Sequence, residues 1–243
     1  MSVRILVLVA SCAVLWSLES VVPLYRYRKD RLRRALPNVA LTVLVLLMNL
    51  ALSFATATVA TSAKATWLKV VIGIVALDFF AYLAHVTLHK LPLGWRFHRV
   101  HHCEEEVDVT TAFRQHPGET VWRVLWQLPA IVIFGVPLWA VVVYLTISSL
   151  NAQLEHANVR VPERLDRMLR LLFVTPNMHK VHHSRQQTET DTNYANIFSV
   201  WDRLFGTYTR RVDFETLRYG LGDVDDHAAR SFRGLMAMPF RAK

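Results

Sequence analysis

Long apolar stretches separated by short polar segments dominate the first two thirds of the chain. They cover about residues 5–25, 38–60, 67–88 and 121–155. The hydrocarbon core of a bilayer is about 30 Å thick and needs about 20 apolar residues in a helix to cross it. Each stretch reaches that length, so the pattern predicts membrane-spanning helices.

The last apolar stretch is too long for one untilted helix. The segment 124–154 contains no Asp, Glu, Lys or Arg, and a single helix of that length would rise about 46 Å. Gly135, Val136 and Pro137 lie near its middle, and glycine with proline favours a break. We therefore expect a hairpin of two shorter helices over residues 121–155.

Basic residues between the first two stretches suggest an orientation. Six of them crowd this segment: Arg26, Arg28, Lys29, Arg31, Arg33 and Arg34. Because such residues are enriched in cytoplasmic segments next to a membrane, we expect this side to be cytoplasmic. The second helix then runs outward, a turn follows at residues 61–64, and the third helix returns. The polar segments 89–120 and 156–243 would lie together on the cytoplasmic face.

The composition agrees with a membrane protein, and it argues against a nucleic-acid partner and against four-cysteine metal sites. Hydrophobic residues make up 53% of the chain and charged residues 19%, while the net charge is +9. No nucleic-acid motif accompanies this charge, so we expect no nucleic-acid partner. Only two cysteines are present, Cys12 and Cys103, too few for a four-cysteine zinc site or iron–sulfur cluster.

Residues 162–174 show an apolar face at helical spacing. Leu165, Met168, Leu169 and Leu172 recur along it, with arginines on the other side. Two interpretations have equal support: an amphipathic helix in the lipid headgroup region, and a half-buried helix of the polar layer.

The histidines carry the clearest chemical signal. An H-x-x-x-H motif is followed by two H-x-x-H-H motifs. On a helix, residues three and four apart lie on one face, so each motif can present two or three imidazoles to one point. Clustered imidazoles are costly to charge and are natural metal ligands. The eight residues are His85, His89, His98, His101, His102, His179, His182 and His183.

Two further histidines are candidates. His156 ends the predicted hairpin on the side where the motifs gather and is a candidate ninth ligand. For His116, which precedes Pro117, two interpretations stay open: a ligand and a turn residue. So many imidazoles exceed what one tetrahedral zinc uses, which predicts two metal ions. Imidazole suits iron, zinc, copper and nickel, so the residue type does not choose among them.

Asp78 lies inside an apolar stretch, where a carboxylate is costly and usually functional. Its spacing to His85 and His89 places it on the same helical face. We expect it to accept the outer N–H of a ligating imidazole and so fix the ring's orientation. The alternative is a hydrogen bond between helices of the bundle.

Together these motifs resemble the fatty acid hydroxylase/sterol desaturase superfamily. The resemblance covers about residues 75–210 and extends beyond the histidines. It includes Glu155-His156-Ala157-Asn158, Thr175-Pro176 before the third motif, Asn193-Tyr194, and the segment 201–207 with sequence WDRLFGT.

The resemblance implies an all-α integral membrane bundle with a cytosolic, histidine-rich helical cap. It also implies a histidine-bound di-iron centre and O2-dependent hydroxylation or desaturation of a lipid such as a fatty acyl chain or sterol. The implied ligands are the eight motif histidines and His156. Asp78, His116, Asn193 and Asp202 are candidates for orienting residues behind them; for Asp202, a helix cap or turn is an equal alternative.

The predicted organisation has three parts. Membrane helices occupy residues 1–74, the catalytic domain with its hairpin occupies 75–210, and a cytosolic tail occupies 211–243. No nicotinamide- or flavin-binding motif is evident, so we expect an external electron donor, a ferredoxin or a cytochrome with its reductase.

Two other functions fit the same histidines. One is a metal transporter or sensor, although transporters usually place their ligands near the bilayer midplane on broken helices. The other is a catalytically inactive, lipid-binding relative. An oxygen-dependent lipid product would separate the enzyme from both.

Overall fold

The structure is a computed structural model that describes residues 2–26, 30–60, 66–211, 213–214, 216–224 and 226–241. Arg28, Lys29 and the turn predicted at residues 61–64 lie outside these ranges. Within them the chain forms helices and three isolated β-bridges but no strand. The predicted all-α class is therefore confirmed.

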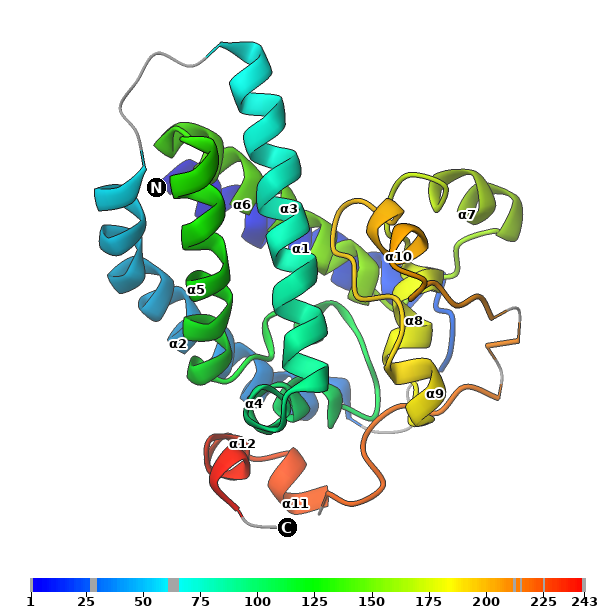
Figure 1. Ribbon diagram of the computed structural model, residues 1–243. Coiled ribbons are helices and arrows are strands. Elements are labelled where there is room, and N and C mark those ends of the chain that lie inside the picture. Colours follow the sequence, from blue (N-terminus) through cyan, green and yellow to red (C-terminus); the bar gives the residue numbers. More distant parts are fainter. Residues whose placement is uncertain are drawn as a thin grey trace.

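Five long helices form the body of the molecule (Figure 1): α1 (Ser2–Val21), α2 (Arg31–Val59), α3 (Trp67–Lys90), α5 (Pro117–Phe134) and α6 (Leu138–His156). Helix α3 packs against both α5 and α6, while α2 packs against α5 and α1 against α6. Leu77, Ile131 and Tyr144 are fully buried where α3, α5 and α6 meet.

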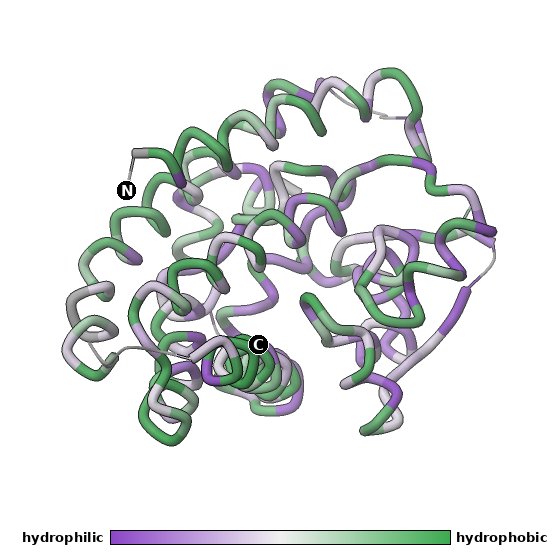
Figure 2. The backbone as a smooth tube through the Cα atoms, turned by 90° about the horizontal axis from the view of Figure 1, so that it is seen from above, coloured by the Kyte–Doolittle hydropathy of each residue, from purple (hydrophilic) through white to green (hydrophobic). Residues whose placement is uncertain are grey.

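The outer surfaces of the long helices are apolar. Helices α1, α2 and α3 are each long and apolar enough to cross a membrane. Leu6, Leu47 and Leu68 are among their exposed side chains, and Figure 2 shows hydrophobic residues along these helices. Since a bilayer is the solvent that accepts such surfaces, the chain is an integral membrane protein with a helical bundle.

The predicted division of residues 121–155 into two shorter helices is present, whereas the membrane hairpin itself stays a prediction. Helix α5 ends at Gly135, whose φ of 57° lies in the left-handed region that favours glycine. Pro137 then caps the start of α6. The earlier Pro129 lies inside α5 without ending it.

Shorter helices gather around the ends of α3 and α6 (Figure 1). They are α4 (Pro92–His102), η1 (Val109–Phe113), α7 (Glu163–Leu169), α8 (Pro176–His182), α9 (Gln187–Thr190), α10 (Val200–Leu204), α11 (Asp226–Ala229), α12 (Phe232–Ala237) and η2 (Met238–Phe240). Helix α4 packs on α3, and α8 packs on α6.

The described residues of the segment 211–243, which was predicted as a tail, pack onto the bundle. Leu235 of α12 and Met238 of η2 contact Leu41 of α2 and Val100 of α4 in a buried apolar cluster. The described part of this segment is therefore anchored to α2 and α4. The predicted division at residues 74 and 210 stays a prediction.

Two arginines of the basic segment bind carboxylates of the protein. Arg31 pairs with Glu19. Arg34 is buried, with its guanidinium 2.8 Å from Asp108 and 3.3 Å from Glu104. Arg31 thereby ties α2 to α1, and Arg34 ties α2 to the segment after α4.

Helix α7 is shorter than predicted, because it ends at Leu169. Asp166 and Arg170 of this region are buried and paired with each other. In contrast, Leu165, Met168 and Leu169 are exposed. The apolar face thus points outward, which favours the headgroup interpretation over a half-buried helix.

Candidate metal centre

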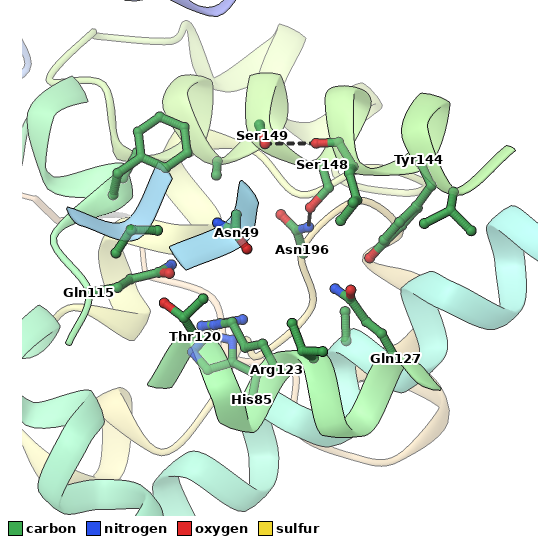
Figure 3. A pocket seen from close by; sticks show the side chains of 18 of the residues that line it. Asn49, His85, Gln115, Thr120, Arg123, Gln127, Tyr144, Ser148, Ser149 and Asn196 are labelled. Carbon is green, nitrogen blue, oxygen red and sulfur yellow. Dashed lines mark hydrogen bonds between the residues drawn. The ribbon is translucent and has the colours of Figure 1, made fainter. Parts of the chain in front are cut away.

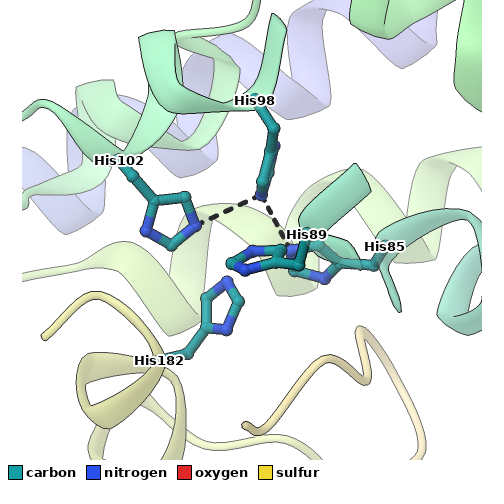
Figure 4. A group of neighbouring side chains, drawn as sticks. All are labelled: His85, His89, His98, His102 and His182. Atoms are coloured by element: carbon teal, nitrogen blue, oxygen red, sulfur yellow. Dashed lines mark hydrogen bonds between the residues drawn. The ribbon is translucent and has the colours of Figure 1, made fainter. Parts of the chain in front are cut away.

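The structure sorts nine buried histidines into two groups, and in each group one ring nitrogen per residue lies within 4.8 Å of the others. All the rings are buried. The five-histidine group, shown in Figure 4, consists of His85, His89, His98, His102 and His182. The four-histidine group consists of His101, His156, His179 and His183.

Helical spacing explains how the groups form. In α4, His98 and His102 are four residues apart and join the five-histidine group, while His101 turns to the other group. The third motif does the reverse: His182 alone joins the five-histidine group. Each H-x-x-H-H motif is therefore divided two and one, and the rings of His102 and His183 stack at a centroid distance of 4.7 Å between the groups.

The inner nitrogens of each group approach closely. In the five-histidine group, Nε2 of His98 lies 3.0 Å from Nε2 of His85 and 3.2 Å from Nε2 of His102. In the four-histidine group, Nε2 of His156 lies 3.0 Å from the Nε2 atoms of three other residues: His101, His179 and His183.

Every outer nitrogen of the five-histidine group has an oxygen neighbour. The Nδ1 atoms of His85 and His182 donate to the Tyr194 and Thr192 carbonyls, both at 2.7 Å. A neutral imidazole that donates through Nδ1 has its lone pair on Nε2. These two rings therefore present ligand lone pairs inward.

The other three rings have side-chain oxygen neighbours. His98 Nδ1 lies 3.0 Å from the Glu119 carboxylate, close enough for an electrostatic contact but outside hydrogen-bonding geometry. His89 Nδ1 lies 3.3 Å from Asp191, and His102 Nδ1 lies 3.4 Å from the Thr190 hydroxyl. Such outer contacts fix the tautomer and raise the basicity of ligand imidazoles.

The four-histidine group is held differently. Only His156 has an outer hydrogen bond, from Nδ1 to the Ala152 carbonyl at 2.6 Å. Among the described residues, Nδ1 of the other three rings has no partner. The Glu155 carboxylate lies 3.9 Å from ring nitrogens of His156 and His179. The orientation of this group therefore depends more on ring packing than on hydrogen bonds.

The imidazoles are neutral at neutral pH. Burial lowers the pKa of His98, His102, His182 and His183 well below the usual value, and neighbouring imidazoles lower it further. Neutral imidazole is the form that binds metals. Converging lone pairs repel one another unless a cation lies between them, so the donor sets of both groups fit metal ions.

Asp78 makes different contacts from those predicted. Its carboxylate accepts the backbone N–H groups of Ile197 and Phe198, at 3.2 and 3.1 Å, and the Trp201 indole N–H at 2.9 Å. It accepts no imidazole N–H within the described residues, so the predicted contact is wrong. The alternative, a hydrogen bond between different elements, describes Asp78 better, because its contacts join α3 to residues 197–201.

Asn193 and Asp202 act on the backbone near the site. Asp202 accepts the N–H groups of Tyr194 and Ala195 at 2.8 and 3.0 Å. Asn193 adopts a left-handed φ of 54°, and its amide donates to the Met178 and Thr209 carbonyls. Both residues thereby position the Tyr194 carbonyl that binds His85. For Asp202, these backbone contacts resemble the helix-cap or turn role that the sequence left open.

His116 belongs to neither histidine group. Its Nδ1 accepts the Gly118 N–H at 3.0 Å at the start of α5, and its ring stacks on Phe97. Of the two interpretations left open by the sequence, the structure favours the turn residue.

Several functional neighbours escaped sequence analysis. Glu119 is fully buried beside His98, yet it lies outside the histidine motifs. Its place just before the apolar stretch at residues 121–155, in the first turn of α5, was the available signal. Asp191 and Thr190 gave no such signal, because they lie in an ordinary polar segment.

A cavity of about 230 Å³ adjoins both histidine groups. His85 of one group lines it, as do His101, His156 and His179 of the other. The remaining lining residues come chiefly from α2, α5 and α6, and Figure 3 shows the polar ones. A molecule in this cavity would therefore reach both groups from within the bundle.

In a comparison with known protein families, the family model described as fatty acid hydroxylase matches residues 70–207. An ornithine lipid hydroxylase of Rhizobium tropici is 32% identical over 179 residues, which are 72% of this chain and 51% of the relative. The alkylglycerol monooxygenase of Homo sapiens is 30% identical over 158 residues, 64% of this chain and 33% of the relative.

A fatty acid hydroxylase of a Lecanicillium species is 27% identical over 164 residues. The chain thus spans about half the length of these relatives or less. No solved structure matches the chain.

Proposed function

The chain belongs to the fatty acid hydroxylase family, and from this premise we propose that it is a membrane-bound, di-iron oxidoreductase that uses O2 to hydroxylate or desaturate a C–H bond of a lipid. The relatives are lipid hydroxylases and an alkylglycerol monooxygenase by name. The chain is accordingly a member of a lipid oxygenase family.

The observation that carries the proposal is the division of nine buried imidazoles into two converging groups. Two groups suit two metal ions, and all-nitrogen donor sets suit iron among other metals. We assign all nine as ligands: His85, His89, His98, His101, His102, His156, His179, His182 and His183. Bound iron supplies the redox chemistry for O2 activation that side chains lack.

The chain's own residues would orient and shield this chemistry. Glu119, Asp191 and the Tyr194 carbonyl hold imidazoles by their outer nitrogens. Buried α3, α5 and α6 side chains exclude water around the site, and the adjoining cavity offers space for a lipid. In hydroxylation, C–H becomes C–OH, and the second oxygen atom of O2 leaves as water with two electrons and two protons.

Membrane topology and electron supply belong to the same proposal. The long helices cross the bilayer several times, and the histidine groups lie on the cytoplasmic side. A ferredoxin or a cytochrome with its reductase delivers the electrons to that side. The basic segment before α2 supports this orientation through its sequence.

An isotope experiment in producing cells tests the reaction. Cells are grown under 18O2, and their lipids are compared by mass spectrometry with those of cells that produce His182→Ala or His183→Ala. His227→Ala serves as the matched control, because His227 is exposed and belongs to neither group.

We expect a lipid with one added 18O, or one that has lost two hydrogens, in wild-type and His227→Ala cells alone. If metal-loaded wild-type protein yields no such product, the oxygenase proposal fails. The transporter or the inactive lipid-binding relative would then explain the histidines better.

A further inference from the structure

The four-histidine group has fewer donors than the five-histidine group and less support from oxygen atoms. It offers four ring nitrogens, and only His156 has an outer hydrogen bond among the described residues. Of the described acidic side chains, only Glu155 lies within 4.0 Å of a ring nitrogen of this group. The structure therefore places a single carboxylate beside these four imidazoles.

Glu155 is buried without a cationic partner. It is 3% exposed, and no described arginine or lysine lies within 4.0 Å of its carboxylate. Asn151 donates to its Oε2 at 3.2 Å. The buried Lys180 ammonium donates to the His156 carbonyl instead. Because a buried charge is costly unless it is paired or coordinates a metal ion, this setting points to a cation bound in the group.

The carboxylates beside the five-histidine group are placed differently. Glu119 and Asp191 each pair with a basic side chain, and each approaches an outer ring nitrogen. Glu155 instead approaches His179 at Nε2, the nitrogen that faces the other rings of its group. Its Oε1 is therefore placed as a donor to the metal and not as support behind a ring.

The distance from Glu155 to His179 allows both residues to bind one ion. Donor atoms about 2.1 Å from the same ion lie at most about 4.2 Å apart, and Oε1 lies 3.9 Å from His179 Nε2. The group as it stands converges through its imidazoles alone. Glu155 lines the adjoining cavity together with His101, His156 and His179. The carboxylate is therefore on the side of the group that is open to the cavity.

Charge balance favours the same assignment. Neutral imidazoles bring no negative charge, whereas a bound divalent ion is the largest local charge in its site. Two carboxylates lie at outer nitrogens of the five-histidine group. Among the described residues, the four-histidine group has Glu155 alone. A carboxylate oxygen bound directly to the ion would offset part of its charge.

We propose that Glu155 is an oxygen ligand of the metal ion in the four-histidine group. The two ions then have different donor sets: five nitrogens in one group, and four nitrogens with one carboxylate oxygen in the other. The inference rests on the metal-binding part of the proposed function and adds a tenth ligand to the nine histidines. It does not depend on which lipid is oxidised.

Infrared spectroscopy of zinc-loaded protein tests the assignment without turnover. Glutamate is labelled with 13C at its side-chain carboxyl group, so that Asp191 does not contribute to the labelled bands. The protein carries Glu119→Gln, which removes the other glutamate beside the histidines. Spectra of the zinc-loaded and metal-free forms are compared, and elemental analysis counts the zinc.

We expect zinc to change the separation of the two labelled carboxylate stretches, because one oxygen of Glu155 becomes metal-bound. Adding Glu155→Gln should abolish this change, whereas adding Glu163→Gln should preserve it, since Glu163 is exposed and belongs to neither group. No labelled change in protein that holds two zinc ions, or a change that survives Glu155→Gln, would overturn the inference.

Zinc release to a chelator separates a ligand from a mere charge. Glu155→Gln removes the charge, and Glu155→Asp keeps it but withdraws the oxygen by one methylene. Both variants should release one of the two zinc ions about tenfold faster or more, and Glu163→Gln should match the wild type. If Glu155→Asp or Glu155→Gln releases both ions at the wild-type rate, Glu155 is not a ligand.

The outcome is separable from the fate of the proposed function. If the labelled band shows zinc bound to Glu155 but iron-loaded protein forms no oxygenated lipid, the oxygenase proposal fails and the ligand assignment stands. If oxygenated lipid forms but zinc leaves the labelled band unchanged, the assignment fails while the oxygenase proposal stands.

Discussion

Glu119 is a buried residue whose substitution tests how the protein supports the five-histidine group. Its carboxylate contacts His98 Nδ1 at 3.0 Å and also pairs with Arg123. Glu119→Gln keeps the shape but removes the charge that raises the basicity of the imidazole. We expect metal to leave the five-histidine group about tenfold faster or more. Release to a chelator, followed by elemental analysis, measures this.

The matched control for this variant is Glu163→Gln, since Glu163 is exposed in α7, pairs with Arg170 and Arg210, and belongs to neither histidine group. Its release rate should equal that of the wild type. If Glu119→Gln also releases metal at the wild-type rate, the carboxylate does not support His98 as described.

The buried histidines also give the metal-free protein a defined pH dependence. Burial lowers the pKa of His102, His182 and His183 in the folded state, whereas the unfolded chain takes up protons below about pH 6.5. The unfolded state then binds more protons at low pH. The free energy of unfolding therefore falls as the pH drops below about 6.5, whereas above that pH these histidines do not lower it. Thermal unfolding of chelator-treated protein from pH 5 to 8 should show a lower Tm at pH 5. A Tm that is flat or higher in acid would contradict it.

At the scale of single residues, local spacing predicted the histidines well and their neighbours poorly. The motifs place histidines three and four residues apart, which helical geometry converts directly into a shared face. Contacts such as Glu119 to His98 or Tyr194 to His85 join different elements, and no spacing encodes them. Asp78 shows the same limit: its cost inside an apolar helix was evident, but its partners lie more than a hundred residues away.

Among the elements, α7 gives the most direct prediction about contact with the bilayer. Met168 is 67% exposed on a face that also carries Leu165 and Leu169. We expect this face to lie in the headgroup region. A nitroxide at Met168→Cys, in a background with Cys12 and Cys103 replaced by serine, should be relaxed more by O2 than by a water-soluble nickel chelate.

The control label belongs at Arg164→Cys on the same helix, which is exposed and carries a charged residue in the native chain. It should be relaxed more by the chelate. If both labels respond equally to the chelate, α7 lies in water.

The predicted elements succeed where the signal is local. Gly135 and Pro137 marked the hairpin break because their backbone preferences act at one position. The end of α7 at Leu169 was missed, because burial of Arg170 against Asp166 depends on the surrounding fold. The packing of α12 on α2 was missed for the same reason.

Across the whole molecule, Arg114 connects the C-terminal segment to the bundle. It is 1% exposed, and its guanidinium donates to the Ala229 carbonyl, to Asn38 and to the Val100 carbonyl. Arg114→Met would leave these acceptors without their guanidinium donor and would remove one of the two arginines that pair with Glu104. We expect a loss of about 3–5 kcal/mol in the free energy of unfolding, seen as a clearly lower Tm in detergent.

The exposed Arg230 offers the comparison for this change, since it forms a surface pair with Glu105. Arg230→Met should change the free energy of unfolding by no more than about 1 kcal/mol. Equal Tm values for the two variants would show that Arg114 does not anchor the segment.

The central claim is that two histidine groups hold two metal ions, and elemental mass spectrometry of protein purified from iron-replete cells tests it most directly. We expect about two irons per chain in the wild type. His182→Ala, in the five-histidine group, and His183→Ala, in the four-histidine group, should each lower this number, and a variant with both changes should retain none. Wild-type protein with one metal ion or none would contradict the claim.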